Sequence, residues 1–264
     1  MYSFLYPGEK QKAVTFSYDD GEVFDRRLVN LFNQYKVKGT FHLNSGKLGM
    51  EGFISEGEVA KLYQGHEVAA HGKQHLYLTH LPKEAILQEV YEDRKSLETL
   101  LQNPVWGYSY AFGEYNSNIV EMLDKMGILY ARTVNSTGQF SVPASFTQWH
   151  PTCHHNENLI TVIQEFQYSP SYIKLPLLYV WGHSFEFERD NNWDMLEQCL
   201  ERVSAIDDVW FATNFEYYEY VTALRSLRTN IEGNIVMNPA GIPIYLKING
   251  QNQKLDAGET LHLK

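Results

Sequence analysis

Cysteine is scarce in this sequence of 264 residues, which contains only Cys153 and Cys199. So few thiols exclude the disulfide framework of a small secreted domain, and they suit a reducing compartment. The chain also lacks any run that approaches the ~20 apolar residues of a membrane span. Lys and Arg number 22 against 32 Asp and Glu, for a formal charge of −10. This excess of negative charge argues against nucleic acid or an anionic membrane as a partner.

Signals for export and for disorder are missing as well. The first residues show no basic segment, long apolar stretch or small-residue cleavage site, so we expect a cytoplasmic protein. A secreted form whose signal was removed before residue 1 is the alternative. Hydrophobic residues make up 44% of the chain and charged residues 20%, which excludes a disordered protein. The length suffices for one large domain or two small ones, with a core that needs no disulfide or metal.

Strand and helix patterns alternate from about residue 12 to residue 227. The predicted strands cover residues 13–18, 40–43, 67–70, 108–112, 129–132, 177–181 and 209–212. The predicted helices cover residues 24–35, 58–64, 82–101, 118–126, 193–203 and 215–227. Residues 135–175 are expected to be mostly loop, with one uncertain element at 159–166. This alternation predicts an α/β protein with parallel strands, and six to eight such units favour a barrel.

The C-terminal part has a different pattern. From about residue 230, short apolar runs are separated by turn residues, and Asn249-Gly250 is a strong hairpin signal. We therefore expect a domain of residues 1–229 and a small antiparallel β-hairpin appendage at residues 230–264 that packs on it.

Residues able to do chemistry follow four predicted strands. Asp19 and Asp20 end the first, His71 and His75 follow the third, and His183 ends a later one. The fourth is the strand at 108–112, which closes on a glycine and could present backbone N–H groups. Each feature taken alone has an ordinary explanation. The aspartate pair could be an acidic turn, the two histidines could be solvated, and His183 could be a structural histidine.

In parallel α/β proteins, such residues meet at one edge of the sheet. Two histidines and one aspartate can hold a Zn²⁺-type ion with an open position for water. The spare carboxylate and the third histidine would supply a base and an acid. Together these residues predict metal-assisted hydrolysis.

Three segments also resemble, in order and spacing, the motifs of a known family. Thr15-Phe-Ser-Tyr-Asp-Asp-Gly21 resembles the T-F-D-D-G motif of the polysaccharide deacetylases, the NodB-homology family of carbohydrate esterases. Gly65-His-Glu-Val-Ala-Ala-His-Gly-Lys-Gln-His75 resembles the G-H-E-[IV]-x-x-H-[ST]-x-x-H motif, and Gly39-Thr-Phe-His-Leu43 is similar to the family's second strand. The resemblance covers about residues 12–227. It implies an irregular (β/α) barrel and a hydrolase of carbohydrate metabolism that removes N-acetyl groups from a polysaccharide or oligosaccharide.

The resemblance also implies roles for individual residues. Asp19 falls on the catalytic base, and Asp20, His71 and His75 fall on the ligands of a divalent metal whose bound water is the nucleophile. Zinc is the first expectation for this metal, with cobalt, nickel or iron as alternatives. His183 falls on the general acid.

The family's P-[YF]-G segment, which lines the substrate groove, falls on Ala111-Phe112-Gly113. The resemblance implies that the Phe112 N–H stabilises the oxyanion. From composition, we expect tryptophan rings to pack against the apolar faces of sugars. The predicted substrate-binding residues are Tyr108, Tyr110, Phe112, Trp149 and Trp181.

Three departures from the family pattern stand out. Ser109 occupies the place of the arginine that orients the base, and Arg132 is the candidate substitute because it ends a predicted strand. The D-x-x-D-W motif, whose aspartate tunes the acid, has no clear counterpart, although Trp149 could supply its aromatic wall. The third departure is a loop with His150, His154 and His155, which is either solvated or a lid that contacts substrate.

These departures leave two alternatives to a sugar deacetylase open. The same site could hydrolyse esters or non-sugar amides, or the chain could be an inactive homologue that only binds carbohydrate.

Overall fold

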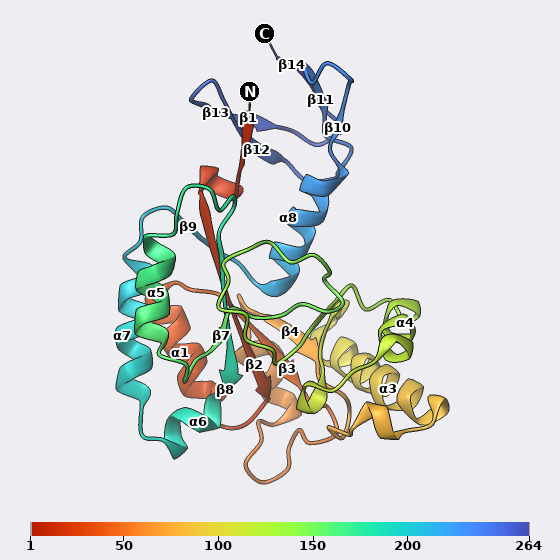
Figure 1. Cartoon of the computed structure of the whole chain (residues 1–264). Helices are drawn as coiled ribbons and strands as arrows, with labels where there is room; N and C mark the ends of the chain where they lie inside the picture. The colour runs from red at the N-terminus through yellow and green to blue at the C-terminus, as the bar shows by residue number, and fades with distance from the viewer. Residues whose placement is uncertain (1, 264) are drawn as a thin grey trace.

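The computed structural model describes residues 2–263, and its main feature is a curled sheet of parallel strands flanked by helices (Figure 1). The strands lie in the order β6-β5-β4-β3-β2-β8-β7, and β9 also pairs with β2. Their bounds are β2 Lys12–Asp20, β3 Gly39–Leu43, β4 Glu67–Ala70, β5 Gly107–Ser109, β6 Tyr130–Arg132, β7 Cys153–His154, β8 Leu177–His183 and β9 Val209–Phe211. The strand β2 is buried along almost its whole length, as expected for the centre of a parallel sheet.

The sheet closes into an irregular barrel. Its edge strand β6 and strand β8 near the other edge are joined by hydrogen bonds to one extended segment, which forms no long regular ladder. The N–H of Thr133, next to β6, donates to the carbonyl of Trp149. A few residues later, the N–H groups of Thr152 and His155 donate to carbonyls of β8. The segment between β6 and β7 thereby connects the two sides of the sheet. The predicted fold class, an irregular (β/α) barrel, is confirmed.

Helices cover the outside of the sheet (Figure 1). Their bounds are α1 Asp25–Tyr35, α2 Val59–Leu62, α3 Lys83–Leu101, α4 Ser117–Lys125, α5 Leu159–Gln167, α6 Ser184–Arg189, α7 Trp193–Ser204 and α8 Asn214–Ser226. Short 3₁₀ turns occupy Pro7–Glu9, Glu56–Glu58, Leu78–His80 and Ala111–Gly113. The helix α1 buries Phe32 against Phe16 of β2, with ring centroids 5.1 Å apart. Burial of one such ring stabilises the fold by roughly 1.5–3 kcal/mol.

The uncertain element at 159–166 is helix α5. The predicted strand at 108–112 is shorter than expected, because β5 ends at Ser109 and a 3₁₀ turn follows at Ala111–Gly113. In this turn Phe112 has a positive φ of 58°, which an extended strand does not allow. No helix in residues 2–263 is long and apolar enough to cross a membrane.

The C-terminal strands form two small antiparallel sheets at one end of the barrel (Figure 1). One contains β1 (Tyr2–Leu5), β12 (Ile244–Ile248) and β13 (Gln251–Leu255), and the other contains β10 (Arg228–Thr229), β11 (Ile235–Met237) and β14 (Thr260–His262). The predicted hairpin turn joins β12 to β13, and its residues Asn249 and Gly250 have φ of 49° and 84°. Two positive φ values are the pattern of the tight hairpin turn.

The N-terminal strand departs from the predicted organisation. The sequence places residues 2–5 with the barrel, whereas β1 pairs with β12 in the appendage. This pairing covers the second edge of β12, which an isolated hairpin would leave open. The domain boundary at residue 229 stays a prediction.

Candidate active site

The candidate residues gather where the strands β2, β4 and β8 end, at the lower edge of the sheet in Figure 1. Asp19 and Asp20 are the last residues of β2, while His71 and His75 lie in the loop that begins after β4. In the register of the sheet, Asp19 lies opposite both His42 of β3 and His183 of β8. Parallel pairing therefore brings together residues that are more than a hundred positions apart in the chain.

Three side chains converge in a way that fits a divalent metal. The Asp20 Oδ1 atom lies 3.8 Å from His71 Nε2 and 3.7 Å from His75 Nε2. Zinc–ligand bonds near 2.1 Å in a tetrahedron place ligand atoms about 3.4 Å apart. Asp20 Oδ1 and His71 Nε2 are both buried, and neither has a hydrogen-bond partner in the described part of the chain. Such orphaned polar atoms are costly, and a cation between them would satisfy both.

The protonation of His71 suits this role. Its Nδ1 atom lies 2.9 Å from the carbonyl oxygen of Ser109 and 2.6 Å from Ser109 Oγ. The carbonyl oxygen can only accept a hydrogen bond, and the hydroxyl donates its own proton to Asp19, so it also accepts here. Nδ1 therefore carries the proton, and the Nε2 that faces Asp20 has its lone pair free. A histidine that binds a metal is usually fixed by such a bond from its other nitrogen.

Strained backbone accompanies the site. Asp20, His75 and Phe112 have φ of 80°, 59° and 58°, in the left-handed region that non-glycine residues rarely adopt. Each costs of order 1–3 kcal/mol and persists only when its surroundings hold it. Such strain is concentrated at functional sites, and here it occurs at the end of β2, in the loop after β4 and in the turn after β5.

Two carboxylates of α3 hold the loop that carries the histidines. Asp93 accepts hydrogen bonds from the backbone N–H of His71 at 3.0 Å and of Gly72 at 2.9 Å. Glu89 accepts one from the N–H of Gln74 at 2.7 Å. Because Asp93 is buried, its anchoring contacts are shielded from water, and they fix the backbone from which His71 projects.

Asp19 is held by a buried arginine at the end of β6, which lies four strands away from β2 in the order of the sheet. Its Oδ2 pairs with Nη2 of Arg132, which is fully buried, and its Oδ1 accepts a hydrogen bond from Ser109 Oγ at 3.2 Å. Burial alone would raise the pKa of Asp19, but the Arg132 guanidinium, and after it His71, holds this pKa well below its usual range. Ser109 and Arg132 are partners in the register of β5 and β6. The guanidinium absent at position 109 is therefore supplied by the next strand, at the candidate residue Arg132.

His183 lies on the other side of Asp20, with its Nε2 4.0 Å from Asp20 Oδ2. Its Nδ1 lies 3.2 Å from Glu186 Oε2. Burial would lower the pKa of His183, but the hydrogen bond with Glu186 and the charges of Asp19 and Asp20 outweigh burial and raise it. Glu186 thus contacts His183 in the way expected of the missing aspartate, although the sequence does not single it out. Its signal is a glutamate three residues after the histidine at a helix start, the spacing of a capping box.

Only some of the aromatic side chains that were predicted to contact substrate are exposed to solvent. Phe112 is 47% exposed, and its ring stacks on Tyr77 with centroids 3.6 Å apart. Tyr108, Tyr110 and Trp149 are buried, which corrects the expectation that they contact substrate. Trp149 packs on the core rings of Tyr179 and Tyr217 instead, so it cannot form an aromatic wall of the site. Trp181 is partly buried against the guanidinium of Arg132.

The histidine-rich loop is not a solvated loop throughout. His155 is fully buried, and His154 Nε2 lies 3.0 Å from Glu186 Oε2. His150 is exposed and contacts Thr133 Oγ1 through its Nδ1 at 2.6 Å. The segment that contains His154 and His155 therefore packs against α6 beside His183.

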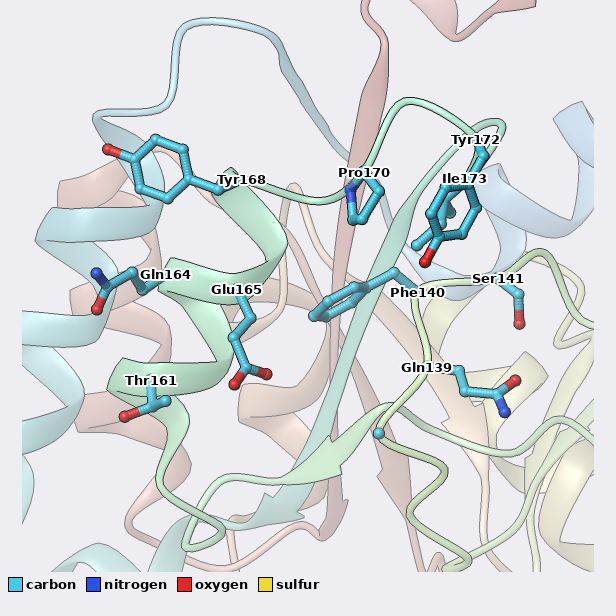
Figure 2. Close-up of a pocket in the computed structure, with 11 residues that line it drawn as sticks. Gln139, Phe140, Ser141, Thr161, Gln164, Glu165, Tyr168, Pro170, Tyr172 and Ile173 are labelled. Carbon is cyan, nitrogen blue, oxygen red and sulfur yellow. The ribbon is translucent and has the colours of Figure 1, made fainter.

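A broad groove of about 930 Å³ lies elsewhere, beside α5 (Figure 2). The ring of Phe140 lies between α5 and the segment that carries Pro170 and Tyr172 (Figure 2). None of the candidate catalytic or metal-binding residues lines this groove. The chemistry of the site is therefore assigned to the edge of the sheet and not to the groove.

Comparison with known proteins shows what this chain is similar to. Residues 7–131 match the family model described as polysaccharide deacetylase, and this range includes Asp19, Asp20 and both candidate metal-binding histidines. The polysaccharide deacetylase model thus matches just under half of the chain. A curated relative, the peptidoglycan-N-acetylglucosamine deacetylase of Bacillus cereus, is 24% identical over 97 residues, which are 36% of this chain and 44% of the relative. The match thus spans less than half the length of that relative.

Solved structures of a deacetylase and an esterase share the fold over most of the chain. One described as a polysaccharide deacetylase from Mycobacterium smegmatis covers 84% of this chain and 94% of its own, with a TM-score of 0.61 and 18% identity. A family 4 acetyl xylan esterase from Clostridium thermocellum, solved in complex with a cobalt ion, covers 78% and 90%, with a TM-score of 0.55 and 13% identity. At these identities the likeness establishes the fold of carbohydrate esterase family 4.

Proposed function

We propose that this protein is a metal-dependent deacetylase that removes N-acetyl groups from a carbohydrate. The observation that carries the proposal is the convergence of Asp20, His71 and His75 between the ionised Asp19 and His183. The match to the family model supports hydrolysis, and the name of the Bacillus cereus relative supports an N-acetylated sugar as substrate. A divalent metal is part of the proposal, with zinc as the first candidate for these nitrogen and oxygen ligands.

When bound by Asp20, His71 and His75, a divalent metal would polarise the acetyl carbonyl and lower the pKa of water. Asp19 would accept the proton of the attacking water. That task requires an ionised and oriented carboxylate, and Arg132 and Ser109 provide both conditions through their contacts with Asp19.

His183 would protonate the departing nitrogen. Because Glu186 holds Nδ1, the proton to be donated lies on Nε2, which faces Asp20. The N–H of Phe112 is the proposed donor to the oxyanion. In a serine protease, one oxyanion donor contributes roughly 3–4 kcal/mol to stabilisation of the transition state.

An ester is the second candidate substrate, because the same base, acid and metal ligands would serve and the name of one structural neighbour is acetyl xylan esterase. Release of acetate from N-acetylated chito-oligosaccharides, acetylated xylan and small amides would separate these candidates. We expect the zinc-loaded protein to release acetate from the oligosaccharides. The variant Asp19→Asn should bind metal normally but turn over at least about 100-fold more slowly, because its base is missing.

Undiminished turnover by Asp19→Asn would refute the assignment of the base. Metal-loaded protein that binds the oligosaccharides but is inactive on every substrate would indicate a carbohydrate-binding homologue instead.

A further inference from the structure

A second group of metal-binding side chains lies at the junction of β7 and α6, behind His183. It comprises His154 and His155, from the end of β7, and Glu186 of α6, and their ligand atoms all lie within 4.8 Å of one another. We propose that these three residues form a second divalent-metal site, suited to zinc, that fastens the β7 segment to α6. This site goes beyond the proposed function, because it shares no ligand with Asp20, His71 and His75.

The separations suit one ion. His154 Nε2 and His155 Nε2 lie 3.0 and 3.5 Å from Glu186 Oε2. Ligand atoms around a tetrahedral zinc are about 3.4 Å apart. The side chains of His154 and Glu186 retain some exposure to solvent, so an ion can enter and water can complete its coordination.

Glu186 Oε2 is surrounded by more nitrogen atoms than it can accept hydrogen bonds from. Besides the two imidazoles, the backbone N–H of His183 lies at 3.1 Å and His183 Nδ1 at 3.2 Å. A carboxylate oxygen has about two lone-pair sites, whereas four nitrogens lie within 3.5 Å of this one, and His155 Nε2 makes no hydrogen bond to it. An ion bound by His154 and His155 would turn two of these crowded contacts into shared coordination, and His183 would keep its bond to Glu186.

His155 gives an independent indication of a ligand. The ring is fully buried, yet neither of its nitrogens has a hydrogen-bond partner in the described part of the chain. The ring lies between Tyr18 and Phe187. An apolar side chain could pack there without the free-energy cost of burying unpaired nitrogen atoms. Gly182 leaves the space that the His155 ring occupies. A Cβ at this position would lie only 1.9 Å from His155 Nδ1. Coordination through Nε2 would account for a polar ring in this place.

Coordination by His154 Nε2 requires the proton to move to Nδ1. That nitrogen now accepts a hydrogen bond of 3.2 Å from the N–H of Asn156, which the exposed turn would release. The tautomer change therefore disturbs one hydrogen bond at the surface and leaves the core contacts of His155 in place.

The test counts zinc ions in untagged protein that has been treated with chelator, reloaded with zinc and dialysed, by elemental analysis. Wild type should hold two ions per chain. The variant Asp20→Ala/His75→Ala should hold one, in the second site, and addition of His154→Ala and Glu186→Gln to it should leave none. His150→Ala, in the same loop but outside the group, is the matched control and should hold two. Buried His155 is left intact so that the core is preserved.

Two results would overturn the proposal: no zinc in folded Asp20→Ala/His75→Ala protein, or unchanged zinc content after His154→Ala and Glu186→Gln. If wild type and Asp20→Ala/His75→Ala each hold one ion, and that ion is lost with His154→Ala and Glu186→Gln, the second site stands and the metal site of the proposed function fails. Circular dichroism of each variant identifies the folded ones.

Discussion

The buried pair of Arg132 and Asp19 allows a quantitative test of how the Asp19 carboxylate is held. The guanidinium and the carboxylate are both almost fully buried. Removal of one partner from such a pair leaves an uncompensated charge and costs about 3–5 kcal/mol. We therefore expect Arg132→Met to lower the free energy of unfolding of the metal-free protein by this amount. The double variant Arg132→Met/Asp19→Asn should recover a large part of the loss, because a neutral amide replaces the unpaired charge.

Urea denaturation followed by tryptophan fluorescence, in the presence of a chelator, measures these changes. The control is Arg26→Met, which removes a solvent-exposed pair with Glu58 and should cost less than about 1 kcal/mol. The reasoning is refuted if Arg132→Met costs no more than this control. Equal stability of Arg132→Met and the double variant would also contradict it, because the cost would then not come from the charge of Asp19.

Two further predictions concern stability. Burial raises the pKa of Glu67 to about 7 in the folded protein, although its hydrogen bonds act to lower it. The protonated Glu67 therefore contributes stability that is fully present below pH 4.5 and is lost as the pH rises through 7. Glu67→Gln should reduce the difference between the free energies of unfolding at pH 5 and pH 8, measured in urea, by up to about 3 kcal/mol. The same difference in the variant and in wild type would contradict this assignment. Gly182→Ala should lower the free energy of unfolding by about 1–3 kcal/mol, because its Cβ would meet His155. The control Gly57→Ala adds a Cβ in open space and should not destabilise the protein. Equal melting temperatures of the two variants would exclude the close contact at Gly182.

The sequence predicts correctly that several of the candidate residues lie at the ends of strands. Asp19, Asp20 and His183 directly end β2 and β8, and His71 follows β4 at once. Parallel strands bring such positions to one edge whatever the details of packing. The family motifs suggest roles for these residues, and the structure shows that their side chains lie close together.

Contacts between strands and across loops are less predictable. That Arg132 reaches Asp19 depends on the register of β5 and β6, which no local pattern reveals. Glu186 has a local signal in its spacing from His183, but that signal describes a helix start equally well. Trp149 illustrates the opposite error, because an aromatic ring suits a sugar site and a core alike, and only packing decides between them.

The most direct test of the account is anomalous diffraction at the zinc absorption edge from crystals of the zinc-loaded protein. The account predicts a peak between Asp20 Oδ1, His71 Nε2 and His75 Nε2, about 2.1 Å from each, that is absent in His75→Ala crystals. Zinc-loaded crystals with no peak among these three atoms would contradict it.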